Sequence, residues 1–168
     1  MTDTFTTWIN FVLTQEGGLT DDANDPGGLT SYGIDQRSHP DVDIRNLTRD
    51  GAIAIYQADY WLKSRADKLP PALAMIYADA AVNQGLGAAA VLLQQSLGVK
   101  ADGNIGPVTL AAANTADVRT LVTEFAARRA LRYAGTANLA SFGLGWMRRL
   151  AAAHALALSL APVAEVVS

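Results

Sequence analysis

The chain contains no cysteine, which excludes disulfide bonds, thiol catalysis and cysteine-ligated metal centres. Only two histidines are present, His39 and His154, and they form no H-x-x-x-H or H-E-x-x-H pattern. A zinc peptidase or zinc amidase is therefore not expected. The sequence also lacks a G-x-S-x-G nucleophile motif and a glycine-rich phosphate-binding loop.

Charged residues are few, at 17% of the 168 residues, and basic residues are not in excess. The 13 Lys and Arg residues against 16 Asp and Glu residues give a net charge of −3, which does not indicate a nucleic-acid-binding protein. Half of the residues are hydrophobic, so a chain of this length can form a sizeable core. We expect a single domain over residues 1–168.

The sequence has no long uninterrupted apolar run. Residues 1–7 are polar, without the basic segment and apolar core of a secretory signal peptide. The most apolar stretch, residues 150–167, contains His154, Pro162 and Glu165 and is dominated by alanine. We therefore expect a buried helix over 150–161 and a loose tail, rather than stable insertion in a membrane. These features suit a protein made in the cytoplasm.

Apolar side chains at helical spacing, capping residues and terminating glycines predict a mainly α protein. Prolines fit the first turns of two of these helices, where the missing N–H is not needed. The predicted helices cover residues 3–16, 48–61, 72–84, 87–97, 107–114, 117–133 and 141–161. The only convincing strand pattern lies in the glycine-rich segment 18–35, which predicts one small β-hairpin.

Glu16 stands at the end of the first predicted helix, directly before Gly17 and Gly18. Glycine readily takes the positive-φ conformation of a helix C-cap, so the helix is expected to end here. A carboxyl group in this place is rigidly supported and partly shielded from water, which favours the protonated form and makes it a candidate proton donor. The alternative is a solvated acid in the last turn, where the helix dipole slightly disfavours it.

A second acid, Asp25, follows nine residues later and opens the turn-forming sequence Asp-Pro-Gly-Gly. Strand-forming residues occupy positions 29–34 directly after this turn. The chain can therefore fold back so that Asp25 and Ser31 face Glu16 across a groove.

Residues 16–34 resemble the catalytic segment of the glycoside hydrolase family 108 muramidases, whose pattern is EGG, a short polar segment, DPGG and then T-x-YGI. The similarity continues in the family's order from about residue 10 to about residue 150. Phage-type lysozymes show a related spacing of Glu, Asp and a hydroxyl residue, with Ser31 standing here where those enzymes usually have Thr. Further matching segments are Tyr60-Trp61, Leu69-Pro70, Asp79-Ala80-Ala81-Val82-Asn83-Gln84-Gly85, Leu93-Gln94, residues 102–109 and Gly145-Trp146-x-x-Arg149-Leu150.

The resemblance implies a lysozyme-like, mainly α (α+β) fold with two lobes around a cleft. Residues 1–68 would carry the catalytic Glu and the hairpin, and residues 69–168 resemble the family's predicted peptidoglycan-binding region. The implied activity is that of an N-acetylmuramidase, or lysozyme, that cleaves the β-1,4 bond between N-acetylmuramic acid and N-acetylglucosamine in peptidoglycan glycan strands. Such an enzyme acts as a monomer and needs no metal and no other cofactor.

The same resemblance implies roles for individual residues. Glu16 would be the general acid, and Asp25 would stabilise the oxocarbenium-like transition state or position a water molecule. Either Ser31 or Thr30 would orient that water. The residues expected to bind the glycan are Thr30, Tyr32, Tyr77, Asn83 and Gln84.

Three features allow two interpretations each. The polar residues within 79–84 lie on one largely buried helix, where they either tie the lobes together through backbone groups or bind the acetamido groups of the glycan. The loop 98–109 resembles that of peptidoglycan-binding modules, but its Asp-Gly and Gly-Pro dipeptides also form an ordinary turn between helices, which we favour. The arginines of 128–132 and 148–149 form either a solvated helix face or a contact with anionic cell-wall polymer or lipopolysaccharide.

The implied biological role is host lysis by a phage or prophage endolysin, which leaves the cytoplasm through a holin lesion and acts on the cell wall. A muramidase that opens the wall for secretion is a second context. Two other classes remain as alternatives. One is a non-catalytic peptidoglycan-binding protein, against which the intact Glu16 and DPGG segment argue, and the other is a chitinase-like glycosidase, since chitinases share this broad fold.

Overall fold

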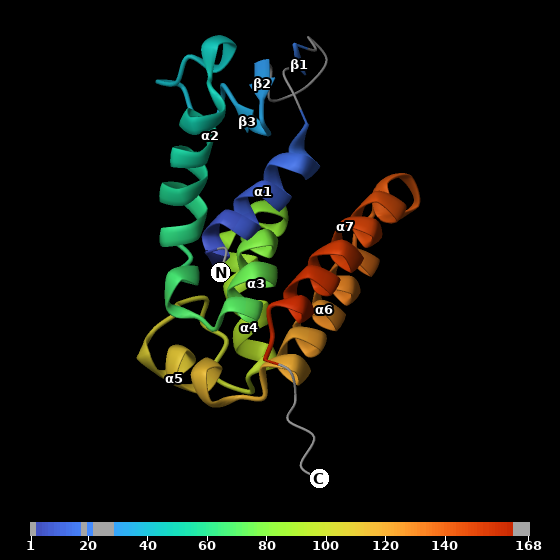
Figure 1. The fold of residues 1–168 in the computed structure, drawn as a ribbon. Coiled ribbons are helices and arrows are strands. Elements are labelled where there is room, and N and C mark those ends of the chain that lie inside the picture. The colour runs from blue at the N-terminus through green and yellow to red at the C-terminus, as the bar shows by residue number, and fades with distance from the viewer. Residues whose placement is uncertain (1–2, 18–19, 22–28, 163–168) are drawn as a thin grey trace.

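The computed structural model describes residues 3–17, 20–21 and 29–162. Within these ranges the protein has seven α-helices and one small sheet, which confirms the predicted mainly α (α+β) class. The sheet lies at one end of the molecule, above the C-terminal end of α1 (Thr4–Glu16), and α2 (Arg49–Tyr56) runs along one side (Figure 1). The other helices are α3 (Pro71–Gln84), α4 (Leu86–Ser96), α5 (Pro107–Thr115), α6 (Val118–Ala134) and α7 (Leu139–Ser159).

Helix α3 forms the centre of the core. It packs against α1, α4, α6 and α7, and every residue from 72 to 81 is buried. A helix that is apolar on all sides is stable only when neighbours cover all of them. The one charged residue in this stretch, Asp79, is therefore buried along with the apolar ones.

The helices begin where the sequence predicts. The Thr48 hydroxyl accepts a hydrogen bond from the backbone N–H of Gly51 at 3.1 Å and caps α2, while Asp117 caps α6 in the same way. Prolines occupy the first turns of α3 and α5. The single helix predicted to reach Trp61 is divided, because α2 continues as a π-helical segment, η2 (Gln57–Leu62). Two short 3-10 helices, η1 (Ile44–Asn46) and η3 (Ala66–Lys68), complete the helical elements of the described residues.

The predicted hairpin is part of a three-stranded antiparallel sheet in the order β1 (Thr20–Asp21), β2 (Leu29–Ser31) and β3 (Ile34–Asp35). Strands β2 and β3 are joined by a two-residue turn, Tyr32-Gly33, with Ser31 paired to Ile34. Both turn residues have positive φ, at 53° and 76°, as a type I′ hairpin turn requires. Tyrosine rarely adopts this conformation, so the turn is held by its surroundings.

The C-terminal helix α7 packs one face on the core, which confirms the predicted helix in this region, whereas Ala151, Ala152 and Ala155 are exposed. Leu150, Ala153 and Ala157 are buried and face the α3–α6 layer. Among the described residues, none of the helices has the length and apolar character to cross a membrane. The expected loose tail lies mostly outside the described residues.

The loop between α4 and α5 is fixed from below by Gln94, which is 1% exposed. The Gln94 amide nitrogen donates to Asp102 Oδ1 at 2.8 Å and to the Asn104 carbonyl at 3.0 Å, and its oxygen accepts from the Gly103 N–H at 2.8 Å. These bonds satisfy a buried amide and several loop groups together. The loop is thus held in place by α4, in agreement with the favoured interpretation that residues 98–109 form a turn between helices.

Candidate active site

Glu16 is the last residue of α1, and this end of the helix lies next to the sheet (Figure 1). Its side chain is 22% exposed, and its Oε1 accepts a hydrogen bond from Arg149 Nη1 at 2.6 Å. Arg149 comes from α7, at the far end of the sequence. The carboxylate is thus held from two helices but still has access to solvent.

Arg149 lies between two carboxylates. It is 11% exposed, and its Nε donates to Asp79 Oδ1 at 2.9 Å while Nη1 binds Glu16. Burial alone lowers the pKa of Arg149, but the negative charges of Asp79 and Glu16 raise it by more, so its pKa lies above the ordinary value. Arg149 therefore stays charged and links the catalytic candidate to the core.

The chain of charges continues to Arg129 on α6. Asp79 and Arg129 are both 0% exposed, and Arg129 Nη2 donates to Asp79 Oδ2 at 2.9 Å. Arg129 also donates to the carbonyl of Ile76 at 3.3 Å. Two anions and two cations thus alternate from α1 through α7 and α3 to α6. Each buried charge has an opposite neighbour, which offsets the cost of removing it from water.

This network corrects one expectation for the arginines. The arginines of 128–132 and 148–149 do not form a solvated face, because the buried Arg129 and the nearly buried Arg149 both turn inward to Asp79. Arg148 and Arg132 are exposed, as expected for a helix face. Arginine side chains that meet buried carboxylates turn inward because the paired charge is more stable there than either charge alone.

The turn between β2 and β3 packs directly on Glu16. A Cβ atom added to Gly33 would lie 2.8 Å from Glu16 Cβ, from Glu16 Oε2 and from the Tyr56 hydroxyl. The Tyr56 hydroxyl donates to the Tyr32 carbonyl at 2.9 Å, so α2 holds the turn in place. Burial, and then the charge of Glu16, raises the pKa of Tyr56, so its hydroxyl remains a donor.

Gly33→Ala is expected to damage both stability and activity. The left-handed backbone costs a non-glycine residue about 1–2 kcal/mol, and overpacking adds about 1–3 kcal/mol. Because the new methyl group meets Glu16 itself, the carboxylate must move. Misplacing a catalytic group by about 1 Å is expected to lower activity by roughly 10²-fold. Thermal unfolding and turbidity of cell-wall suspensions would measure the two effects.

Gly98→Ala is the matched control. Gly98 also has positive φ, at +68°, but an added Cβ would meet nothing within 4 Å. Its stability cost is therefore the backbone term alone, and its activity should remain near that of the parent. Equal activity losses in the two variants would show that the Gly33 contact with Glu16 is unimportant.

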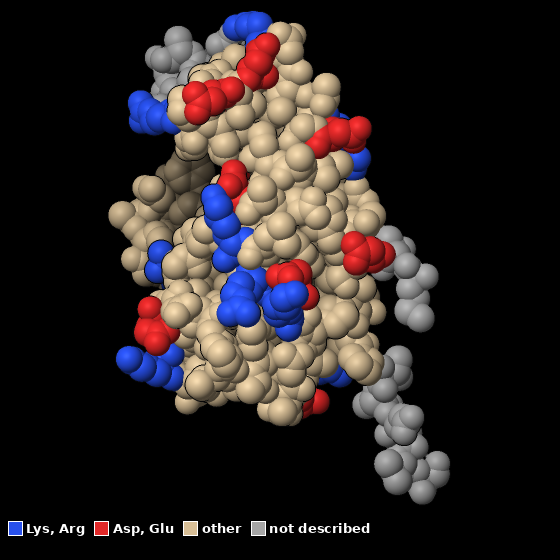
Figure 2. All heavy atoms as spheres, turned by 90° about the vertical axis from the view of Figure 1, so that its left-hand side faces the viewer, with Lys and Arg blue, Asp and Glu red and all other residues tan. Residues whose placement is uncertain are grey.

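The predicted hydroxyl residues both lie on β2, beside the turn. Ser31 is 5% exposed and Thr30 is partly exposed. Adjacent residues of a strand point to opposite faces of a sheet, so the two hydroxyl groups do not share one face. Asp25 lies outside the described residues, and its role stays a prediction. Figure 2 shows the surface hollowed below the end that carries the sheet.

Tyr77 does not face a cleft. It is 1% exposed, its hydroxyl donates to the Ser64 carbonyl at 3.1 Å, and its ring packs edge-on to Phe125. The prediction that Tyr77 binds glycan is corrected on this point: its position on the fully buried helix α3 makes it a core residue.

Asn83 and Gln84, at the end of α3, differ in their surroundings. Asn83 Oδ1 accepts a hydrogen bond from the Tyr133 hydroxyl, which also contacts Arg129. The Gln84 amide is buried and has no hydrogen-bond partner within the described ranges. A role for either amide in binding acetamido groups stays a prediction.

Sequence reasoning missed Arg149, Gly33 and Tyr56 as parts of the site. Arg149 had one usable signal, its place in the Gly-Trp-x-x-Arg-Leu segment that resembles the family. Gly33 likewise belongs to the T-x-YGI segment. Tyr56 had none, because nothing in its sequence neighbourhood distinguishes it from a core aromatic.

Comparison with known proteins agrees with this geometry. The family model for glycosyl hydrolase 108 matches residues 9–85, and a model described as a predicted peptidoglycan domain matches residues 88–151. The solved structure of SagA from Brucella abortus is 30% identical and superimposes with a TM-score of 0.85, covering 97% of this chain and 98% of that one. The chain belongs to the glycosyl hydrolase 108 family. It is therefore a glycosidase with peptidoglycan as its partner. The comparison with curated proteins found no significant match.

Membership of the glycosyl hydrolase 108 family confirms the resemblance found in the sequence. The first matched region contains Glu16 and Gly33, and the second contains Arg129 and Arg149. The charge network from Glu16 to Arg129 therefore joins residues of both matched regions.

Proposed function

We propose that this protein is an N-acetylmuramidase that cleaves the β-1,4 bond between N-acetylmuramic acid and N-acetylglucosamine. The observation that carries the proposal is the position of Glu16, a partly exposed carboxylate fixed by Arg149 at 2.6 Å beneath a hairpin, in a glycosyl hydrolase 108 chain. A glycosidase acid needs this combination of rigid support and access to substrate.

In the proposed mechanism Glu16 protonates the leaving glycosidic oxygen. Its Oε1 is occupied by Arg149 Nη1, so Oε2 is the oxygen that carries the proton to the substrate. The backbone of Gly33 packs against this carboxylate, since an added Cβ would lie 2.8 Å from Oε2, and so helps to fix its position. Asp25 then stabilises the oxocarbenium-like transition state or positions the attacking water, and Ser31 or Thr30 orients that water.

The biological role that we propose is host lysis by a phage or prophage endolysin, made in the cytoplasm and released to the wall through a holin. The second candidate is a muramidase that opens the wall locally for secretion, which needs the same bond cleavage. Loss of lysis, or loss of export, after deletion of the gene would separate the two.

Mass spectrometry of digested sacculi tests the bond assignment. A muramidase releases muropeptides that end in reducing N-acetylmuramic acid, whereas reducing N-acetylglucosamine would show cleavage of the other glycosidic bond. Release of chito-oligosaccharides from chitin would support the chitinase-like alternative. Binding to sacculi without soluble products would support a non-catalytic protein.

A further inference from the structure

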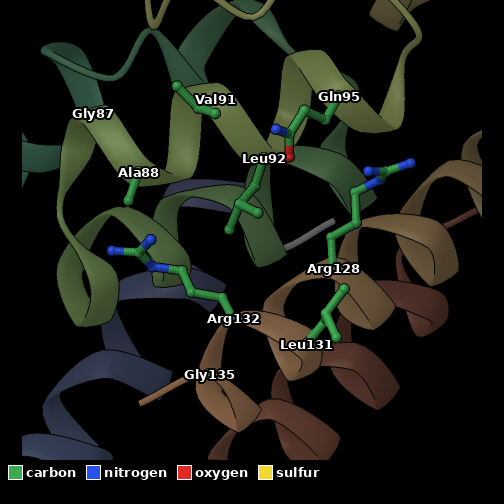
Figure 3. Close-up of a pocket in the computed structure, with 9 residues that line it drawn as sticks. All are labelled: Gly87, Ala88, Val91, Leu92, Gln95, Arg128, Leu131, Arg132 and Gly135. Carbon is green, nitrogen blue, oxygen red and sulfur yellow. The ribbon is translucent and has the colours of Figure 1, made fainter. Parts of the chain in front are cut away.

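A groove separate from the Glu16 site lies between α4 and α6 (Figure 3). Its volume is about 540 Å³, within the range of pockets that hold small ligands. It belongs entirely to the region matched by the predicted peptidoglycan domain, apart from Gly87 at its edge. The groove is lined by Gly87, Ala88, Val91, Leu92, Gln95, Arg128, Leu131, Arg132 and Gly135.

The floor of the groove is apolar and built from aliphatic side chains. Ala88, Val91 and Leu92 supply it from α4, and Leu131 contributes from α6. Leu131 is 74% exposed, so part of this apolar surface remains in water. An exposed leucine beside an apolar groove favours a ligand that brings aliphatic groups of its own.

Two arginines border this floor. Arg128 and Arg132 are one helical turn apart on α6, and Figure 3 shows their guanidinium groups on different sides of the apolar residues. Arg128 is paired with Glu124 at 2.7 Å but has a buried Nε without a hydrogen-bond partner in the part of the chain that the structure describes. No acid of the described residues pairs with Arg132, which is exposed.

We propose that this groove binds the stem peptide of peptidoglycan, with peptide carboxylates on Arg128 and Arg132 and alanine methyl groups on the floor. The inference rests on the proposed action on peptidoglycan. A stem peptide is short, carries free carboxylates and contains alanine, so its charges and its methyl groups match the two arginines and the floor between them. Arginine suits this role because its planar fork binds carboxylates with two parallel hydrogen bonds.

Other anionic or saccharide ligands match the groove less well. The glycan backbone consists largely of hydroxyl and acetamido groups, which do not call for two cations. A phosphate-rich polymer would use the arginines but would gain nothing from Val91, Leu92 and Leu131. The combination of cations and apolar floor therefore fits an anionic peptide with small side chains better than either of these ligands.

The first experiment compares two substrates and two variants. Sacculi with their stem peptides and sacculi stripped of peptides by an amidase would be digested by the parent, by Arg128→Gln/Arg132→Gln and by Arg148→Gln. Arg148 is an exposed arginine on α7 and serves as the matched control. We expect the parent to have an apparent KM about fivefold lower on peptide-bearing sacculi, from two partly exposed charge pairs.

The double variant should lose this preference while keeping its kcat on peptide-free strands, and Arg148→Gln should behave like the parent. A parent enzyme without the preference, or a double variant that keeps it, would overturn the inference and leave the muramidase assignment intact. If neither substrate is cleaved, the proposed function fails. A direct binding measurement then tests by itself whether the groove binds the stem peptide.

Direct binding would be measured by NMR titration of the full chain with a free stem tripeptide. We expect methyl shifts at Val91 and Leu131 in the parent and in Arg148→Gln, and their loss in the double variant. Equal shifts with inorganic phosphate or lipopolysaccharide, or none with the peptide, would contradict a stem-peptide site.

Discussion

Glu16→Gln is expected to lower the rate of cell-wall hydrolysis by roughly 10²–10⁴-fold, the contribution of one positioned general acid. Glutamine has the same shape but carries no transferable acidic proton. Its oxygen still accepts from Arg149 Nη1, so the fold should survive, with a loss of about 1–2 kcal/mol from the weaker hydrogen bond. Activity on peptide-free glycan strands and thermal unfolding would measure the two quantities separately.

Glu124→Gln is the control for this substitution. Glu124 is also a glutamate paired with an arginine, Arg128 at 2.7 Å, but it is 45% exposed and lies on α6 away from the sheet. It should keep full activity on peptide-free strands. A Glu16→Gln enzyme within a few-fold of the parent would remove Glu16 from the mechanism.

Most of the fold could be predicted because its signals are local. Pro71 and Gly85 bound α3, Asp117 caps α6, and the apolar pattern of residues 150–161 predicts a helix that packs on the core. The π-helical segment Gln57–Leu62 had no such signal, because its hydrogen bonds depend on packing rather than on residue type. The sheet was predicted only as a hairpin, because the strand-forming pattern of residues 29–34 gave no sign of the turn at Tyr32-Gly33 that divides β2 from β3.

The candidate site could be predicted only in part, because its decisive contacts join distant parts of the chain. Asp79 is an acid in an apolar helix, which shows that it needs a partner. The identity of that partner is not readable from spacing, since Arg129 and Arg149 lie 50 and 70 residues away. The same limit led to the expectation that Arg149 faces solvent and that Tyr77 faces the cleft.

The network around Asp79 affects both the stability of the fold and the position of the catalytic acid. Asp79 on α3 forms an ion pair with Arg149, and Arg149 forms one with Glu16. The buried helix α3 therefore helps to position the acid next to the sheet. Buried ion pairs often add little net stability over apolar residues, but breaking one is costly. We therefore infer that the network serves mainly to position Glu16, which substitutions at Asp79 can test.

Asp79→Leu is expected to have the largest effect on stability. Both carboxylate oxygens accept from buried or nearly buried arginines at 2.9 Å, and leucine offers no acceptor. Removing one partner of a buried ion pair costs about 3–5 kcal/mol, out of a total stability of about 5–15 kcal/mol. For a chain of this size the melting temperature should fall by about 6–20 °C. Asp67→Leu breaks the exposed pair with Lys68, also at 2.9 Å, and should cost less than about 1 kcal/mol.

The double variant Asp79→Leu/Arg129→Met separates the effect of the network on stability from its effect on activity. It removes one buried charge of each sign, so we expect the unfolding free energy to return to within about 1–2 kcal/mol of the parent. Arg149 then still pairs with Glu16 but has lost its ion pair with Asp79, so Glu16 is positioned less well. Activity should therefore stay about tenfold below the parent despite the recovered stability. A double-mutant cycle on both quantities would measure the coupling. Recovery of full activity along with stability would show that Asp79 neutralises Arg129 and has no part in positioning Glu16.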